Sequence, residues 1–280
     1  MSSSESNISQ PSSSQPSSSQ RSISQKLIAA REACSSLDAF PGDVPETPEA
    51  AYQVQDLCIS GWKDDLVGWK VAGLKAELHE LFKAQRQSGP VFKKNLQFST
   101  GSDHILAPVF ADGFAAIEAE FVIKLADVSS LPTSNLSIDD AIKAIDTVYM
   151  GIEIASSPMK DTHSYGTLGP ISDFGNNGGV IVGPEVSNWR DIDLSTIDVS
   201  VKIGDELVGS ANTKPALDGP LGAVTYLIEH LAKRGHKLEA GTYISSGAIT
   251  GAHQASVGVP SEVTFGDIGT ISLELVSNSK

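Results

Sequence analysis

Basic residues are scarce in this chain of 280 residues, which has 20 lysines and arginines against 34 aspartates and glutamates. The formal net charge is therefore −14 at pH 7. Nucleic acids are bound through clustered lysine and arginine side chains that neutralise phosphates, so this deficit argues against a nucleic acid partner. The same excess of acidic groups disfavours binding to an anionic membrane surface.

Cysteine and long apolar runs are also scarce. The two cysteines, Cys34 and Cys58, lie in separate segments that both have helical patterns. The chain thus lacks the cysteine framework of a small secreted domain, and we expect buried thiols in a reducing, cytoplasmic location. No apolar run approaches the roughly 18 residues that a membrane-spanning helix needs, so we expect no membrane-embedded segment.

Several common catalytic motifs are missing. The sequence contains no Gly-X-Ser-X-Gly elbow, no phosphate-binding Gly-Lys-Ser/Thr loop and no Cys/His spacing suited to zinc. The glycine-rich segment "GNNGGVIVG" precedes a strand pattern rather than opening a helix, so it does not fit a dinucleotide site. We therefore expect none of these classes of site.

The first 24 residues differ in composition from the rest. They are mostly serine, glutamine and proline and include two copies of "QPSSS". Such a segment buries too little apolar surface to offset the entropy lost on ordering, so residues 1–24 are predicted to be a disordered tail. They contain no apolar stretch typical of a secretory signal, and a weak likeness to an organelle transit peptide stays open as an alternative. Residues 25–280 are predicted to form a single domain.

Helical patterns dominate the first part of that domain, residues 25–100. A helix around Leu27 is followed by one that Thr47 is suited to cap, with Pro48 at its first position. A third helix is predicted over residues 75–87. This portion is therefore expected to be helical.

Strand patterns dominate residues 101–280, interrupted by two helical segments, "SIDDAIKAIDTV" and "GPLGAVTYLIEHLAKRG". The strand candidates are 117–125, 149–155, 179–183, 196–203, 206–210, 242–246, 262–266 and 270–276. A hairpin is predicted to turn at Gly204 and Asp205. With so few crossover helices, the pattern favours an α+β fold with a rolled or barrel-like mixed sheet over a doubly wound sheet.

The stretch "AAIEAEFVIKL" combines a strand pattern with two unexplained carboxylates. Every second residue from Ile117 to Leu125 is apolar, which predicts one apolar face. The other face carries Glu118 and Glu120, which repel each other, and Lys124 alone cannot lie close to both.

A second strand pattern, "YMGIEIASS", presents a third carboxylate. Glu153 stands between Gly151 and Ala155, whose small size is expected to leave room beside it. If the two strands were neighbours, Glu118, Glu120 and Glu153 would supply three hard oxygen ligands of the kind that Mg²⁺ or Mn²⁺ binds. Such a cation would offset the repulsion between the carboxylates. A solvated strand face with loosely paired carboxylates is the other interpretation that the spacing allows.

Five short segments, taken in order along the chain, carry a family resemblance. They are "GWKVAG", "IEAEFVIKL", "GIEIASS", "GGVIVG" and "AGTYISSGAITG". Together they resemble the 2-keto-4-pentenoate hydratase family of the fumarylacetoacetate hydrolase-like superfamily. The resemblance runs from about residue 25 to the C-terminus. It implies a highly twisted mixed β-roll with an N-terminal helical portion, in which residues 25–280 form one hydratase-like catalytic domain.

The resemblance also implies roles for particular residues. In the family a Glu-X-Glu pair and a later glutamate of a Gly-Ile-Glu strand bind a divalent cation, and these positions match Glu118, Glu120 and Glu153. Lys70 matches the lysine of a Gly-X-Lys motif that reaches the substrate near the metal, although Ala72 replaces a glycine usual in the family. A bound dication would lower the pKa of that lysine, whereas without the family it would be a surface lysine.

A loop near the end of the chain matches the family's site for the substrate carboxylate. Ser246 and Gly247 would supply hydroxyl and backbone N–H donors to that carboxylate. The implied substrate is a small 2-oxo or 2-hydroxydienoic acid, which chelates Mg²⁺ or Mn²⁺. The implied reaction adds water to a 2-hydroxy-2,4-dienoate and gives a 4-hydroxy-2-oxo acid through a metal-stabilised enolate, with Lys70 as the acid–base group. The family further implies a homo-oligomer that acts in the breakdown of aromatic compounds.

One departure from the family pattern leaves alternatives open. Family hydratases carry an aspartate just ahead of a glycine, where this chain has Ser88 and Gly89. Decarboxylation of a 2-oxo-3-enedioate, or cleavage of a carbon–carbon bond in another 2-oxo acid, uses the same enolate and is the main alternative. Hydrolysis with a histidine base would have His253 as its one candidate near the predicted site. A binding scaffold that retains the metal site without turnover is the remaining alternative.

Overall fold

A computed structural model describes residues 15–213 and 219–278, and within this part the strands form two sheets. The first contains β1 (Leu66–Gly73), β2 (Arg86–Phe92), β3 (Leu96–Phe98), β5 (Phe114–Leu125), β6 (Ile145–Ser157), β7 (Asn177–Glu185), β10 (Tyr243–Ser245) and β11 (Ala252–Gln254). Their order is β2-β1-β10-β5-β6-β7-β3, and β11 also pairs with β5. The second contains β4 (His104–Val109), β8 (Val199–Ile203), β9 (Glu206–Ala211), β12 (Pro260–Phe265) and β13 (Gly269–Ser277), in the order β4-β13-β12-β8-β9.

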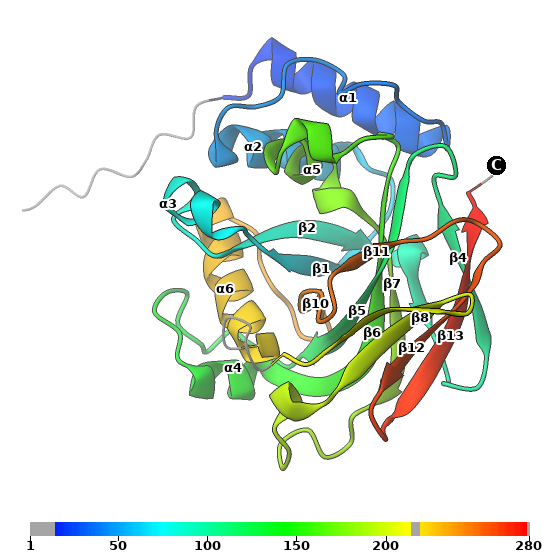
Figure 1. Cartoon of the computed structure of the whole chain (residues 1–280). Coiled ribbons are helices and arrows are strands. Elements are labelled where there is room, and N and C mark those ends of the chain that lie inside the picture. The colour runs from blue at the N-terminus through cyan, green and yellow to red at the C-terminus, as the bar shows by residue number, and fades with distance from the viewer. Residues whose placement is uncertain (1–14, 214–218, 279–280) are drawn as a thin grey trace, which may run out of the picture.

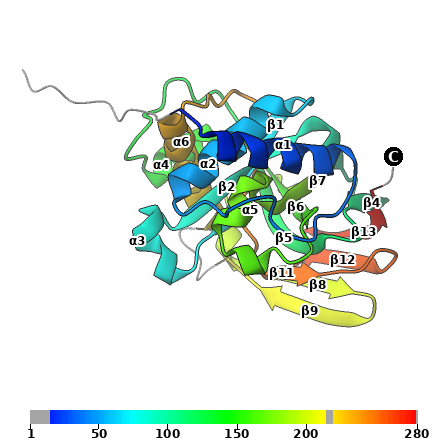
Figure 2. The ribbon, with the colours of Figure 1, turned by 90° about the horizontal axis from the view of Figure 1, so that it is seen from above.

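Apart from one short helix, the helices of the described part lie in two groups around the rolled sheet. They are α1 (Ser18–Glu32), α2 (Pro48–Gly61), α3 (His79–Phe82), α4 (Ile138–Ala144), α5 (Leu168–Ser172) and α6 (Gly219–Arg234). Helices α1, α2 and α5 lie together across one end of the sheet, and α4 and α6 lie at its side (Figure 1). Seen from above, α1 crosses the top of the molecule (Figure 2). None of the helices in the described ranges is long and apolar enough to cross a membrane.

The predicted α+β fold with a rolled mixed sheet is confirmed. Parallel pairings such as β1 with β10 and β13 with β4 stand among antiparallel ones, as in β5 with β6. The predicted hairpin connects β8 and β9, and Gly204 takes a φ of +57° in its turn. Helix α6 occupies its predicted range and is followed by Gly235, whose φ of +78° suits glycine at a helix end.

The main hydrophobic core lies between the two sheets. The apolar residues predicted for one face of β5, from Ile117 to Leu125, are all buried in it. The inner faces of β12 and β13 and one side of α6 complete this core, with Phe265, Leu273 and Leu227 fully buried. Strands β5 and β6 are buried on both faces, so the carboxylates on their other face lie inside the protein rather than in water. The solvated-face interpretation of these glutamates is therefore wrong.

The first helix begins earlier than the tail prediction allows. Residues 18–24 of the predicted tail belong to α1, while residues 1–14 lie outside the described part of the chain. Ser17 accepts a hydrogen bond from the backbone of Gln20, whose side chain bonds back to Ser17. Serine is favoured at such N-caps, and Ile23 packs in a second apolar cluster. Serine-rich composition alone therefore misplaced this boundary.

The predicted third helix is only partly present. A single turn and α3 end at Phe82, and Lys83 takes a φ of +48°. The chain then forms β2, which pairs along β1 from Leu66 to Gly73. Gly89 and Pro90 cannot extend a helix favourably, and pairing with β1 satisfies the backbone instead. Residues 25–100 therefore contribute two long strands to the main sheet and are not purely helical.

Candidate metal centre

Strands β5 and β6 bring three glutamates together. In their antiparallel register Glu118 lies opposite Glu153, and Glu120 lies opposite Gly151. Residues paired in this way point to the same face of a sheet, and Glu118 and Glu120 share that face because side chains alternate along a strand. One carboxylate oxygen from each glutamate lies within 4.8 Å of the others. The condition set by the sequence, that the two strands be neighbours, is met.

This cluster is buried. Glu120 and Glu153 have no exposed surface, and Glu118 is 8% exposed. Burial, followed by the charges of Glu153 and Glu118, raises the pKa of Glu120 well above its ordinary value. Burial also raises the pKa of Glu153, although the ammonium group of Lys70 opposes this shift. Three carboxylates in this small volume therefore favour either protonation or a bound cation.

Lys70 is the cation in contact with the cluster. It comes from β1, which reaches β5 through the three-residue strand β10, with Lys70 paired to Ser245 and Ser245 paired to Val122. Lys70 Nζ lies 3.2 Å from Glu153 Oε2, and both side chains are almost completely buried. Burial alone lowers the pKa of Lys70, but the surrounding carboxylates outweigh it and raise that pKa above its ordinary value. A bound dication is expected from the sequence to lower the pKa of Lys70. The protein's own carboxylates shift this pKa in the opposite direction.

Two donors, one at the end of β10 and one in the loop after it, hold one oxygen of Glu120. The Ser245 hydroxyl and the Gly247 backbone N–H, at 2.9 Å, both donate to Glu120 Oε2. Ser246 is buried, and its backbone N–H donates to the Phe121 carbonyl at 3.1 Å. The predicted carboxylate loop thus lies at the site, but the Gly247 donor contacts a protein carboxylate here. Ser245, which the sequence did not single out, occupies the position beside the glutamates.

The donor set fits a hard divalent cation. Glu120 Oε1 is buried and has no hydrogen-bond partner within the described residues, which is costly for a carboxylate oxygen. Glu153 Oε1 accepts from Asn177 Nδ2 at 3.0 Å, which leaves Oε2 for Lys70 or a cation. Carboxylate oxygens are the ligands that Mg²⁺ and Mn²⁺ prefer, and three of them meet here. A dication would satisfy the unpaired oxygen and offset the repulsion at once.

The space expected beside Gly151 is filled by protein. A Cβ atom at Gly151 would lie 2.3 Å from Cγ2 of Val122, so the glycine makes room for that valine. Val122 belongs to an apolar cluster with Val180 and Val182 on the same face of the sheet. The prediction that this glycine opens space for a ligand is therefore wrong.

Ser88, which stands where family hydratases carry an aspartate, does not face the glutamates. Gly89 pairs with Lys70, whereas Ser88 pairs with Val71 and therefore points to the opposite face. Its hydroxyl lies 3.4 Å from Arg234 Nη1, and its backbone N–H donates to the Tyr52 hydroxyl at 3.1 Å. The residue next to Ser88 in β2, Gln87, lies on the same face of the sheet as Lys70.

Gln87 is a residue that the sequence reasoning missed. It pairs with Ala72, two residues beyond Lys70, and its Oε1 is buried without a hydrogen-bond partner in the described residues. An unpaired buried amide oxygen on this face is available to a ligand. The alternation of β2 would have indicated this residue, had the segment been predicted as a strand.

Replacing Ser88 by alanine is expected to leave kcat and KM within about twofold, since its hydroxyl points away from the site. Loss of its contact with Arg234 is expected to lower the free energy of unfolding by about 1 kcal/mol. Steady-state kinetics and urea unfolding measure the two effects. The matched variant Gln87→Ala is expected to change kcat/KM at least tenfold, and an equal effect of both substitutions would contradict this assignment.

His253 does not reach the carboxylates. It pairs with Ile117, on the core face of β5, while Ala252 pairs with Glu118. Its Nε2 lies 3.0 Å from the Thr250 hydroxyl, and the ring packs against Gly209. A histidine base in direct contact with the site is therefore not available from this residue.

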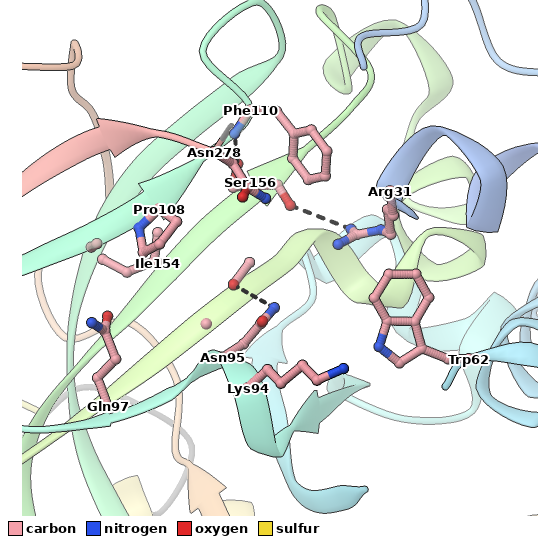
Figure 3. A pocket seen from close by; sticks show the side chains of 13 residues that line it. Arg31, Trp62, Lys94, Asn95, Gln97, Pro108, Phe110, Ile154, Ser156 and Asn278 are labelled. Carbon is pink, nitrogen blue, oxygen red and sulfur yellow. Dashed lines mark hydrogen bonds between the residues drawn. The ribbon is translucent and has the colours of Figure 1, made fainter. Parts of the chain in front are cut away.

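A separate cavity of about 310 Å³ lies on the other side of β6 (Figure 3). Ile154 and Ser156 line it, whereas Glu153 points to the opposite face. Arg31, Trp62 and other residues from several elements complete its wall. None of the predicted site residues lines this cavity, so it is distinct from the carboxylate cluster.

The chain is similar to two groups of characterised proteins, although no family model matches it. It is 29% identical over 160 residues to 4-oxalocrotonate decarboxylase of Pseudomonas putida, and this alignment covers 57% of this chain and 60% of the decarboxylase. It is 24% identical over 228 residues to 2-keto-4-pentenoate hydratase 1 of Dechloromonas aromatica (strain RCB), and this alignment covers 80% of this chain and 84% of the hydratase. The alignment thus spans less than two thirds of the decarboxylase.

A solved structure shares the fold. The 4-oxalocrotonate decarboxylase from Pseudomonas putida G7, complexed with magnesium and adipate, superimposes with a TM-score of 0.75 at 22% identity, covering 92% of this chain and 97% of that one. This likeness shows that the two proteins share their fold, a mixed α+β fold with a curled sheet. In sequence, the chain is similar to 2-keto-4-pentenoate hydratases and 4-oxalocrotonate decarboxylases.

Proposed function

We propose that the protein is a lyase that adds water to a 2-hydroxy-2,4-dienoate and produces a 4-hydroxy-2-oxo acid. The observation that carries this proposal is the buried cluster of Glu118, Glu120 and Glu153, in contact with Lys70, in a chain similar to these hydratases and decarboxylases. Relatives named 2-keto-4-pentenoate hydratase support the hydration of such an acid. The substrate is a small organic acid.

The glutamates are the proposed ligands of Mg²⁺ or Mn²⁺. Solved relatives of the decarboxylase type were obtained with magnesium or with calcium, which supports a dication in this fold. When bound, the cation supplies a Lewis acid that offsets negative charge on the 2-oxygen and the carboxylate of the substrate. Glu120, held by Ser245 and Gly247, is fixed in orientation before any ligand arrives.

Lys70 is the proposed acid–base group. Its Nζ lies 3.2 Å from Glu153, so the reacting part of a substrate at the glutamates is within its reach. The dienol becomes a 2-oxo-3-enoate when a proton is added at carbon 5 and the enol proton is lost. Water then adds across the remaining double bond, with oxygen at carbon 4 and hydrogen at carbon 3. Lys70 is positioned to move a proton in these steps, while burial of the site limits access of bulk water.

Ser246 and Gly247 remain the proposed contacts for the substrate carboxylate. Both follow β10 directly, and Gly247 takes a φ of +112°, a conformation suited to glycine. Gly247 N–H lies against Glu120 Oε2, so a carboxylate bound there would lie next to the cation ligands. The proposal includes a change of partner, in which the Gly247 N–H donates to Glu120 without substrate and to the substrate carboxylate when substrate is bound.

Decarboxylation of a 2-oxo-3-enedioate is the second candidate function. One observation favours it: in the described part of β2, the face shared with Lys70 carries Gln87 and Gly89, and no carboxylate to activate a water. Relatives named 4-oxalocrotonate decarboxylase are consistent with this reaction. The longer coverage of the hydratase relative, 84% of its length, keeps hydration as the main proposal.

We further propose a cytoplasmic homo-oligomer that acts in the breakdown of aromatic compounds. The acidic composition, the two free cysteines and the family support this setting. The catalytic domain is proposed to comprise residues 25–280 together with the earlier turns of α1, preceded by the serine-rich tail.

Turnover of 2-hydroxypenta-2,4-dienoate by the full chain tests the proposed function. With Mg²⁺ we expect the ultraviolet absorbance of the dienol to decay and a 4-hydroxy-2-oxo acid to appear by mass spectrometry. Removal of the cation with a chelator is expected to lower the rate at least 100-fold, and renewed Mg²⁺ to restore it. Release of CO₂ from a 2-oxo-3-enedioate without hydration of the dienol would favour the second candidate. Turnover of neither substrate would contradict both.

A further inference from the structure

Arg31 of α1 makes a buried ion pair with Asp173, a residue distant from it in sequence. Its Nε lies 2.6 Å from Asp173 Oδ1, and its Nη2 lies 2.9 Å from Asp173 Oδ2. The two side chains are only 5% and 1% exposed. This two-pronged geometry fixes the carboxylate in orientation as well as in distance.

The same guanidinium also holds backbone groups on both sides of a turn. Its Nη1 donates to the Asn177 carbonyl at 3.0 Å, and its Nη2 lies 3.2 Å from the Asp173 carbonyl. It donates as well to the Ser156 carbonyl of β6 at 3.3 Å, as Figure 3 shows. One side chain thus connects the beginning and the end of the turn 173–177 with the strand that carries Glu153.

This turn has an unfavourable backbone conformation. Phe174 and Asn176 take φ values of +54° and +62°, in the left-handed region that residues with a side chain rarely occupy. Such conformations persist where surrounding contacts enforce them. The Arg31 guanidinium lies 4.7 Å from the centre of the Phe174 ring, in addition to its hydrogen bonds to the turn. Arg31 is therefore a main contact that keeps this conformation.

The turn contacts both Glu153 of the carboxylate cluster and the neighbouring Lys70. Asn177 Nδ2 donates to Glu153 Oε1 at 3.0 Å and thereby orients that carboxylate. Gly175 packs so closely on Lys70 that an added Cβ would lie 3.4 Å from Lys70 Cδ. Groups that orient ligand carboxylates in this way affect the affinity for a metal, although they do not touch it.

We propose that Arg31 is a positioning residue that sets the affinity of the site for its divalent cation, by holding Asn177 on Glu153. This inference rests on the proposed metal site. Arg31 lies on the cavity side of β6, opposite the glutamates, so it acts through the turn and not by contact.

Mn²⁺ binding to the full chain, measured by calorimetry, tests the proposal without reference to turnover. Arg31→Ala and Asn177→Ala are each expected to weaken Mn²⁺ binding at least tenfold. If Arg31 acts through Asn177, the double variant binds within about twofold of Asn177→Ala alone. Two effects that multiply in the double variant would overturn the proposal, as would an Arg31→Ala affinity within twofold of the wild type.

The cavity provides a second, independent readout. Because Arg31 lines it, the space left by Arg31→Ala is expected to join this cavity. Guanidinium chloride at low millimolar concentration is expected to restore at least half of the lost affinity, and equal sodium chloride or urea to restore none. Arg190→Ala is the matched control, since Arg190 also stacks on an aromatic ring and donates to a β6 carbonyl, at Ile145. That variant is expected to bind Mn²⁺ within twofold of the wild type.

The outcomes separate this inference from the proposed function. Absence of Mn²⁺ binding by the wild type, with no difference from Glu120→Gln, would contradict the proposed metal site itself. Should Arg31→Ala fail to fold, Arg31→Lys replaces it, because lysine keeps the charge but not the two-pronged contact. A folded Arg31→Lys variant is expected to bind Mn²⁺ at least fivefold more weakly, and unchanged affinity would overturn the proposal.

Discussion

Replacing Glu120 by glutamine is expected to remove divalent cation binding and to make the metal-free protein more stable. The carboxylate lies among two other glutamates, is fully buried and has one oxygen without a partner. Glutamine keeps an acceptor for Ser245 and Gly247 but removes a buried negative charge, which is expected to stabilise the metal-free fold by about 1–2 kcal/mol. Turnover is expected to fall at least 100-fold. Thermal unfolding in a chelator and calorimetry with Mn²⁺ measure the two opposite effects.

The stabilisation is expected to depend on pH with a defined sign. Burial and the neighbouring carboxylates raise the pKa of Glu120 above its unfolded value, so the folded state binds the extra proton between the two pKa values. Wild-type metal-free protein therefore loses stability as pH rises from about 4.5 through the raised pKa, by up to about 1.4 kcal/mol per pH unit from this group. Glu120→Gln lacks this loss, so its advantage widens as pH increases. The exposed strand residue Glu262, changed to glutamine, is the control and should show neither effect. A metal-free Glu120→Gln protein less stable than wild type would contradict the assignment.

Replacing Lys70 by methionine is expected to abolish turnover while preserving the metal site. The ammonium group 3.2 Å from Glu153 competes electrostatically with a cation, so its removal is expected to leave Mn²⁺ affinity unchanged or several-fold tighter. Loss of the proposed acid–base group is expected to lower kcat at least 1000-fold, with KM little changed. The metal-free variant is expected to be less stable, because the carboxylates lose their contacting cation.

Lys124 supplies the matched control for this experiment. It lies on the same face of β5 as the glutamates but pairs with Asp146 at 3.3 Å and is partly exposed. Lys124→Met is expected to retain kcat within about twofold. Turnover by Lys70→Met within tenfold of wild type would exclude Lys70 as the acid–base group. A loss of Mn²⁺ binding in that variant would instead indicate a structural role.

The sequence predicted the carboxylate cluster because local patterns encode it. The alternation around Glu118 and Glu120 defines a strand face, and the isolated Glu153 defines a second one. The rolled sheet was predicted for the same reason, since most of its strands carry their own period-two signal. The register that sets Glu118 opposite Glu153 depends on long-range packing and could only be stated as a condition.

Features set by tertiary contacts were missed. Strand β2 follows a helical pattern and contains Gly89 and Pro90, so its pairing with β1 has no local signal. The opposite faces on which Gln87 and Ser88 lie follow from that pairing, so the family pattern could single out Ser88 but could not show that it faces away from the glutamates. Asn177 is likewise brought to Glu153 by a turn whose conformation depends on Arg31, which is 146 residues away.

Strand β10 determines when this site is completed during synthesis. Its three residues join β1, with Lys70, to β5, with the glutamates, and they are Tyr243–Ser245, late in the chain. A ribosome-bound chain that ends before them contains the lysine and all three glutamates. It lacks both the strand that brings these residues together and the loop that fixes Glu120. The nascent protein therefore cannot assemble the proposed cation site until β10 and this loop have been synthesised and have paired with β1 and β5.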